Sequence, residues 1–234
     1  MSSKHAKIEA HASHLLDAFI ELRHRYALLG PMLFEEAVPR RWGSGRRAHG
    51  FAILRHTLFL SCCQDIAKLT MDSDGRAPSL RNLMAELADD DLRSGCREQF
   101  ATWKLPPVEE EADPAIAAAL RQIETDEERE LRHQFDTLYD EAVDLWQRLS
   151  ASVTMNGFRT IRDKVTAHTE VRHVADKYEL VDIAKLGIKW GDLLATIQAM
   201  QRLVAILGML IRNAGFAWDS LDVQLARASA GFWE

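Results

Sequence analysis

Apolar side chains recur at intervals of three and four residues over most of this chain, and no other feature constrains the fold as strongly. Within residues 8–29 the pattern places seven of them on one helical face: Ile8, Ala12, Leu15, Phe19, Leu22, Tyr26 and Leu29. This spacing is that of an amphipathic α-helix, in which 3.6 residues make one turn. The alternation that is typical of strands does not occur over a useful length, and no solenoid repeat is present. The sequence therefore predicts an all-α fold.

Helix-capping and helix-breaking residues predict where the helices begin and end. The first helix is expected to stop at Gly30-Pro31, and the arginine-rich residues 34–50 are expected to form a loop. Further helices are predicted over 51–69, from Ser79, from the aspartates at 89–91, from Asp113-Pro114 to Ser150, within 154–171, from Ile188 to Asn213, and from Asp219. Thr125 begins a sequence with capping-box spacing, which could restart or kink the helix predicted from Asp113-Pro114 to Ser150. A short extended piece is expected at 180–183.

These elements predict an up-and-down helical bundle with a helical and loop insertion between Pro31 and Pro114. At 234 residues, the chain is interpreted as a single domain over 1–234. Residues 104–113, rich in proline and glutamate, form the clearest linker-like stretch, and 114–234 is the half that carries the motif described below.

Composition and charge exclude several classes of protein. The composition is ordinary for a soluble globular domain, and a net charge of −6 argues against a protein that coats nucleic acid non-specifically. Three cysteines without a CxxC pair indicate reduced core thiols. No signal peptide is recognised, and the longest apolar run, 203–211, is shorter than the roughly 20 residues of a membrane helix. We therefore expect a cytoplasmic protein without a membrane contact, and we predict no cofactor.

The heptapeptide Arg162-Asp163-Lys164-Val165-Thr166-Ala167-His168 concentrates more usable chemistry than any other stretch. An arginine holds a phosphate or a phosphorane through donors that are always charged. A histidine passes protons near neutral pH because its usual pKa is about 6.5. Together these groups could cut RNA without a metal ion, with His168 as general base or acid and Arg162 stabilising charge on the phosphorane. In this scheme Asp163 would orient one of those groups, and Lys164 would hold a neighbouring phosphate.

The motif also resembles a known family. Arg, then Asp or Asn, then Lys, then Ala-His is the signature of HEPN domains, and this version is most similar to the AbiU2-like branch. Two further segments, Ile188–Leu194 and Ser79–Leu83, look like corresponding parts of that branch. The resemblance implies a helical bundle that forms a homodimer across the motif helix, so that both motifs line a cleft where RNA is cut. It also implies a toxin-like role in defence or stress, with an antitoxin protein as a possible partner.

Two observations qualify what the resemblance implies. On an ideal α-helix, six residues rotate by about 600°, which leaves Arg162 and His168 roughly 120° apart. One helix would not aim both side chains at one phosphorus, so the hypothesis requires the dimer. In some HEPN toxins, a tyrosine two residues after the histidine is modified by a nucleotidyltransferase antitoxin. Here that position is Glu170, and the next tyrosine is Tyr178. Inhibition by another kind of antitoxin stays open.

Other interpretations of these residues stay open. The motif arginine, aspartate and lysine could instead form a solvated helix face. The chain would then be a catalytically silent bundle that binds RNA or a protein partner. A third possibility is a purely structural oligomerisation module. The loop with Arg40, Arg41, Arg46 and Arg47 around Trp42 suits RNA contact through phosphates and base stacking. His11, His14, Asp17 and Glu21 lie at helical spacing, but a solvated face explains them better, and no metal site is predicted.

Overall fold

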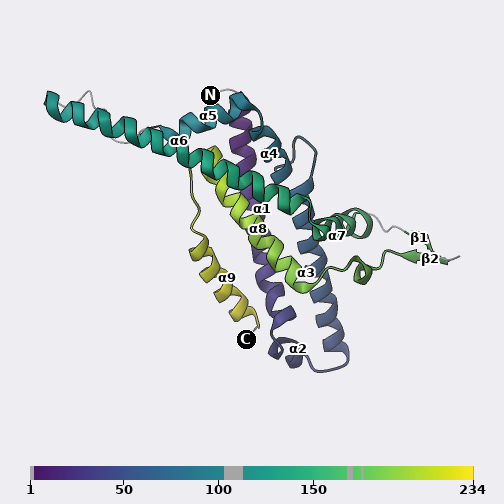
Figure 1. Ribbon diagram of the computed structural model, residues 1–234. Coiled ribbons are helices and arrows are strands. Elements are labelled where there is room, and N and C mark those ends of the chain that lie inside the picture. Colours follow the sequence, from purple (N-terminus) through teal and green to yellow (C-terminus); the bar gives the residue numbers. More distant parts are fainter. Residues whose placement is uncertain (1–2, 103–112, 168–170, 175–176, 234) are drawn as a thin grey trace.

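The computed structural model describes residues 3–102, 113–167, 171–174 and 177–233 (Figure 1). Its α-helices are α1 (Ser3–Phe34), α2 (Ala37–Arg41), α3 (Arg46–Met71), α4 (Leu80–Leu87), α5 (Asp90–Ala101), α6 (Pro114–Ser150), α7 (Val153–Ile161), α8 (Trp190–Arg212) and α9 (Trp218–Trp233). A π-helical turn, η2 (Arg162–Thr166), continues α7, and a 3-10 turn, η3 (Ile183–Leu186), precedes α8. The predicted all-α bundle is confirmed.

A two-stranded antiparallel hairpin is the feature that residue spacing did not predict. Strand β1 (Val171–Val174) pairs with β2 (Lys177–Leu180) in a register that sets Val171 opposite Leu180. The extended piece expected at 180–183 is confirmed only at Leu180, which ends β2, because Ile183 begins η3. The hairpin projects from the side of the bundle beyond α7 (Figure 1).

The bundle is built on α1, α3, α6 and α8. Helix α1 packs against both α3 and α8, and α6 packs against α5 and α8. The segment predicted as an insertion contains α2, α3, α4 and α5. The buried face of α3 is part of the central core. Phenylalanines 19, 135 and 158 are the largest side chains that are completely buried. The amino-terminal half of α6 extends past the other helices, and α9 lies along α1 (Figure 1).

Helix α1 does not stop at Gly30-Pro31 but continues to Phe34 with Pro31 inside it. A proline within a helix lacks the N–H that would bond to the carbonyl four residues earlier, here that of Ala27. The Ser229 hydroxyl of α9 donates to the carbonyl oxygen of Ala27 at 2.7 Å, and the Trp233 indole N–H donates to that of Leu28 at 3.1 Å. Helix α9 thus satisfies the carbonyl that Pro31 leaves unpaired, which explains why the helix tolerates the proline.

Replacing Ser229 by alanine is expected to lower the free energy of unfolding by about 1–3 kcal/mol, because it leaves a part-buried carbonyl without a partner. The measurement is chemical denaturation followed by circular dichroism. In a Pro31→Ala background, residue 31 regains its N–H, and the same serine substitution is then expected to cost clearly less. Equal costs in the two backgrounds would show that the Ser229 bond does not compensate for Pro31.

Three predicted helix starts are confirmed by their capping bonds. The Ser79 hydroxyl accepts from the Asn82 N–H at 3.2 Å, and the Asp89 carboxylate accepts from the Leu92 N–H at 3.0 Å. The Asp113 carboxylate accepts from the Ala115 N–H at 2.8 Å, one residue after Pro114. Of the predicted linker 104–113, only Asp113 lies within the described residues.

The predicted restart at Thr125 does not occur. The Thr125 hydroxyl donates to the carbonyl oxygen of Arg121 at 2.8 Å, one turn back within the same helix. Because the side chain bonds to its own helix instead of capping a new one, α6 runs without interruption from Pro114 to Ser150.

The arginine-rich segment is mostly helical, so the loop predicted over 34–50 is wrong. Arg40 and Arg41 end α2, and Arg46 and Arg47 begin α3, which starts five residues before the predicted Phe51. Only residues 42–45 separate these helices. Gly43 and Gly45 have φ values of +60° and +75°, which favour glycine, and they allow the chain to reverse between α2 and α3.

Most of the apolar stripe of α8 lies in the core, although Trp190 and Leu194 are exposed. Ten residues of the helix are buried, including Leu193, Ile197 and Leu203. Among the described residues, α8 is the one helix whose length and composition would allow it to cross a membrane, a test that the core helix of a soluble protein also passes. The three cysteines are free and buried, and burial raises the pKa of the Cys62 thiol to about 12 and that of Cys96 to about 11.

Candidate functional site

Helix α7 ends at Ile161, immediately before the motif begins at Arg162. The Ser152 hydroxyl caps α7 by accepting from the Met155 N–H at 3.1 Å. Met155, Phe158 and Ile161 recur at helical spacing and are completely or almost completely buried. Because these side chains anchor one face of α7 in the core, against α3, the residues on its other face are directed outward.

At Arg162 the chain leaves α-helical geometry. The Ala167 N–H donates to the carbonyl oxygen of Arg162, five residues earlier, at 2.9 Å, and the Thr166 hydroxyl donates to the same oxygen at 3.0 Å. Turns of this π type are rare and often occur at functional sites. The expected separation of roughly 120° between Arg162 and His168 assumes an ideal α-helix, so it does not apply to this segment.

The side chains of Arg162 and Asp163 form the best-defined pair of the motif. The Arg162 Nε donates to the Asp163 carboxylate at 2.6 Å, and Arg159 Nε lies 3.6 Å from the other carboxylate oxygen. The Arg162 side chain is 21% exposed, whereas that of Arg159 is 57% exposed. Asp163 therefore bridges two arginines and orients the less exposed one. Arg159 was missed at the sequence level, although its position one turn before Asp163 was a usable signal.

The other predicted motif residues divide into two groups. Lys164 lies on the same π turn and is partly buried, and Val165 packs against the core. The structure thus brings Arg162, Asp163 and Lys164 together on one turn. His168 and Glu170 lie outside the described residues. Tyr178 lies in β2, where its backbone pairs with that of His173.

Gly157 lets the segment between the hairpin and α8 approach α7 closely. A Cβ atom at this position would lie 2.9 Å from two side-chain carbons of Ile188 and 3.8 Å from the carbonyl oxygen of Leu186. Ile188 packs against the core between η3 and α8. The contact therefore joins α7, five residues before Arg162, to the chain that follows the hairpin.

We expect Gly157→Ala to destabilise the protein by about 1–3 kcal/mol, since overpacking at this distance forces Ile188 to move. Thermal unfolding would measure the loss. Combining the change with Ile188→Val, which removes one of the two clashing carbons, is expected to restore part of the stability. A further loss in the double variant would show that the Gly157 contact is not the cause.

The four arginines that were predicted to contact RNA lie apart from the motif. In Figure 1, α2 and the beginning of α3 lie at the lower end of the bundle, well below α7 and the hairpin. Arg40 pairs with Glu36, and the Arg41 guanidinium donates to the main-chain carbonyl oxygen of Trp233. Arg46 and Arg47 are exposed.

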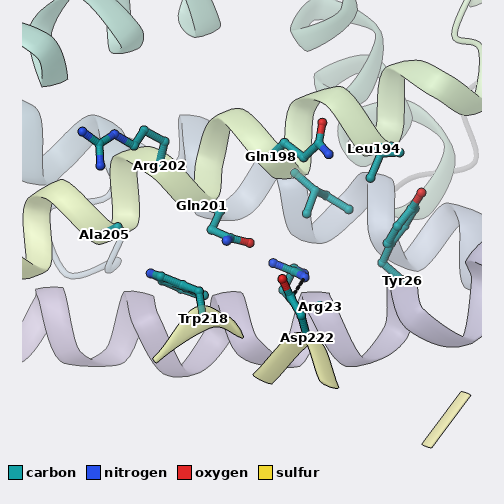
Figure 2. Close-up of a pocket in the computed structure, with 10 residues that line it drawn as sticks. Arg23, Tyr26, Leu194, Gln198, Gln201, Arg202, Ala205, Trp218 and Asp222 are labelled. Carbon is teal, nitrogen blue, oxygen red and sulfur yellow. Dashed lines mark hydrogen bonds and ion pairs between the residues drawn. The ribbon is translucent and has the colours of Figure 1, made fainter. Parts of the chain in front are cut away.

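A cavity of about 380 Å³ lies between α1, α8 and α9 (Figure 2). Arg23 and Asp222 form an ion pair of 2.5 Å across it, and the side chains of Gln201 and Trp218 extend toward the same space. None of its lining residues belongs to the motif. No three His, Cys, Asp or Glu side chains in the described part of the chain are grouped so that they could hold a metal ion.

Comparison with known proteins adds one finding. The family model HEPN_AbiU2, described as AbiU2, matches residues 5–232. No curated protein and no solved structure matches the chain. The match covers almost the whole chain, including α7 and the π turn that carries Arg162 and Asp163. The chain therefore belongs to the AbiU2 family of HEPN domains.

Proposed function

We propose that this protein is an endoribonuclease that cuts RNA by attack of a 2′-hydroxyl on the adjacent phosphorus and requires no metal ion. The base removes the 2′-hydroxyl proton, the 2′-oxygen forms a bond to phosphorus, and the bond from phosphorus to the 5′-oxygen breaks. The leaving 5′-oxygen takes up a proton. The products are a 2′,3′-cyclic phosphate and a 5′-hydroxyl.

His168 serves as the general base or acid, a role that contributes about 10²–10⁴-fold to the rate. Arg162 stabilises the negative charge that builds up on the phosphorane oxygens. Asp163 positions Arg162, and Lys164 contacts a neighbouring phosphate. Proton transfer and charge stabilisation, the two requirements of this reaction, are thus both met by side chains of the motif.

The Arg162–Asp163 contact is the observation that carries this proposal. A guanidinium that is bonded through Nε to a carboxylate has a fixed plane, so that its terminal N–H groups can meet phosphate oxygens with little loss of conformational freedom. A solvated helix face would not require this arrangement beside a π turn. Membership of the HEPN_AbiU2 family supports the same conclusion.

The active form in this proposal is a homodimer in which the motifs of the two protomers face a shared cleft. The protein acts as a toxin-like effector in the cytoplasm, and a protein antitoxin holds it in check. Because Glu170 stands where some HEPN toxins carry a modified tyrosine, that antitoxin acts by a means other than modification of this position.

The test is cleavage of RNA by the purified protein in the presence of EDTA. Wild-type protein is expected to produce fragments ending in a 2′,3′-cyclic phosphate, and His168→Ala is expected to lose at least about 99% of the rate. A single 2′-deoxy substitution at the cut site is expected to block cleavage there. Equal cleavage by wild type and variant would identify a contaminating nuclease. RNA binding without cleavage would instead favour a catalytically silent module.

A further inference from the structure

We propose that the cavity between α2, the beginning of α3 and the end of α9 is a second binding site for single-stranded RNA, separate from the motif. The cavity has a volume of about 350 Å³. It is lined by aromatic and cationic side chains from both ends of the sequence: Val38, Arg41, Trp42, Arg47, Phe232 and Trp233. This inference rests on the proposed function in one respect, namely that RNA is the substrate.

The aromatic side chains form a connected cluster with exposed ring surface. Trp42 stacks on Phe51 with ring centres 5.6 Å apart, and Trp233 meets Trp42 edge-on at 6.4 Å. Trp42 is 37% exposed and Phe232 is 59% exposed, although both are large apolar residues. Exposed rings that are held by their neighbours provide surfaces on which unpaired bases can stack, whatever the base.

Cations surround these rings. Arg41 binds the main-chain carbonyl of Trp233 and thereby fixes the end of α9 against α2. Arg47 lines the cavity, and its neighbour in the sequence, Arg46, is exposed in the first turn of α3, which carries no acidic residue. Because Arg46 and Arg47 are like charges with no acidic neighbour in that turn, their placement favours an anionic ligand.

The combination of rings and cations identifies the ligand class. Single-stranded nucleic acid offers both phosphates and unstacked bases, whereas an acidic peptide or an anionic membrane surface offers the charge without the planar rings. The chain as a whole carries a net charge of −6, so a cationic cavity lined with aromatic rings is a local exception. Because α2 and the beginning of α3 lie well below α7 in Figure 1, such a site would hold the substrate strand away from the point of cleavage.

The test measures binding of a labelled 2′-O-methyl oligoribonucleotide by fluorescence anisotropy. Such RNA lacks the attacking hydroxyl, so binding is measured without cleavage. Arg46→Gln combined with Arg47→Gln is expected to raise Kd by about 10-fold and to reduce the slope of log Kd against log salt by about 0.7 for each phosphate that the variant no longer binds. Phe232→Leu is expected to raise Kd roughly 5- to 150-fold with the slope unchanged, whereas Phe232→Tyr keeps the ring and the affinity.

Arg81→Gln combined with Arg121→Gln is the matched control, because it removes two exposed arginines elsewhere and changes the net charge equally. Thermal unfolding confirms that each variant is folded. Unchanged Kd in the Arg46 and Arg47 variant, or an equal loss in the control, would overturn the inference. The inference would also be overturned if the Arg46 and Arg47 variant lost binding to phosphatidylserine vesicles or to an acidic peptide while its binding to RNA was unaffected.

The result also separates the two proposals. Cleavage that depends on His168, combined with an unchanged Kd in these variants, would refute the second site and leave the proposed nuclease intact. If instead the wild-type protein cleaves no RNA, but these variants bind RNA more weakly than the wild type does, the proposed nuclease is refuted and the second site stands.

Discussion

An Arg162→Ala variant is expected to cleave RNA at least about 100-fold more slowly than the wild type, because it removes a charged donor that stabilises the transition state. The fold should persist. The part-buried Arg162 side chain bonds to its neighbour Asp163, and α7 is anchored in the core through Met155, Phe158 and Ile161. Rates of RNA cleavage under single-turnover conditions, together with thermal unfolding, measure both statements.

Two variants make this test specific. Arg159→Ala removes the same charge one turn earlier, from a more exposed side chain that lies 3.6 Å from the same carboxylate, and is expected to change the rate by less than about 10-fold. Arg162→Lys retains the charge without the planar fork of donors, so its rate should lie between those of wild type and alanine. Equal losses at positions 159 and 162 would mean that net charge, and not the positioned Arg162, supports cleavage.

The helices of this protein could be predicted from sequence because their signals are local. Ser79 and Asp113 cap the helices that follow them through bonds within three residues of the chain, and such bonds depend only on neighbouring residues. The apolar stripe of α8 and its end at Asn213, which adopts φ +49°, follow in the same way. The pairing of Arg162 with its neighbour Asp163 is likewise a local interaction.

Two of the errors arose where distant residues decide the structure. Pro31 is a helix breaker by every local rule, and it is tolerated because Ser229, almost two hundred residues later in the chain, donates to the Ala27 carbonyl. In the same way, the arginine-rich segment gave no sign that Phe232 and Trp233 would pack beside Trp42. The π turn at Arg162 depends on a choice between two similar hydrogen-bond patterns, which residue spacing does not distinguish.

Mixing two inactive variants is expected to restore activity if the motifs of two protomers share one cleft. Arg162→Ala and His168→Ala each lack one essential group. In such a cleft we expect a phosphate to be bound by Arg162 of one protomer and reached by His168 of the other. A mixed dimer then contains one complete site and one that lacks both groups. Random exchange makes half of the dimers mixed, so roughly a quarter of the wild-type activity should return.

The experiment is refolding or co-expression of the two variants in equal amounts, followed by the RNA cleavage assay. Each variant alone remains at about 1% of the wild-type rate or below, so recovery to roughly a quarter is easily measured. The control is the double variant, which carries Arg162→Ala and His168→Ala in one chain. When it is mixed with wild type, no site in a mixed dimer can combine Arg162 of one protomer with His168 of the other. Dimers that form in solution without recovery would show that each protomer uses its own arginine and histidine. A protein that stays monomeric and is still active would refute the shared cleft, because the Arg162–Asp163 pair would then act within a single bundle.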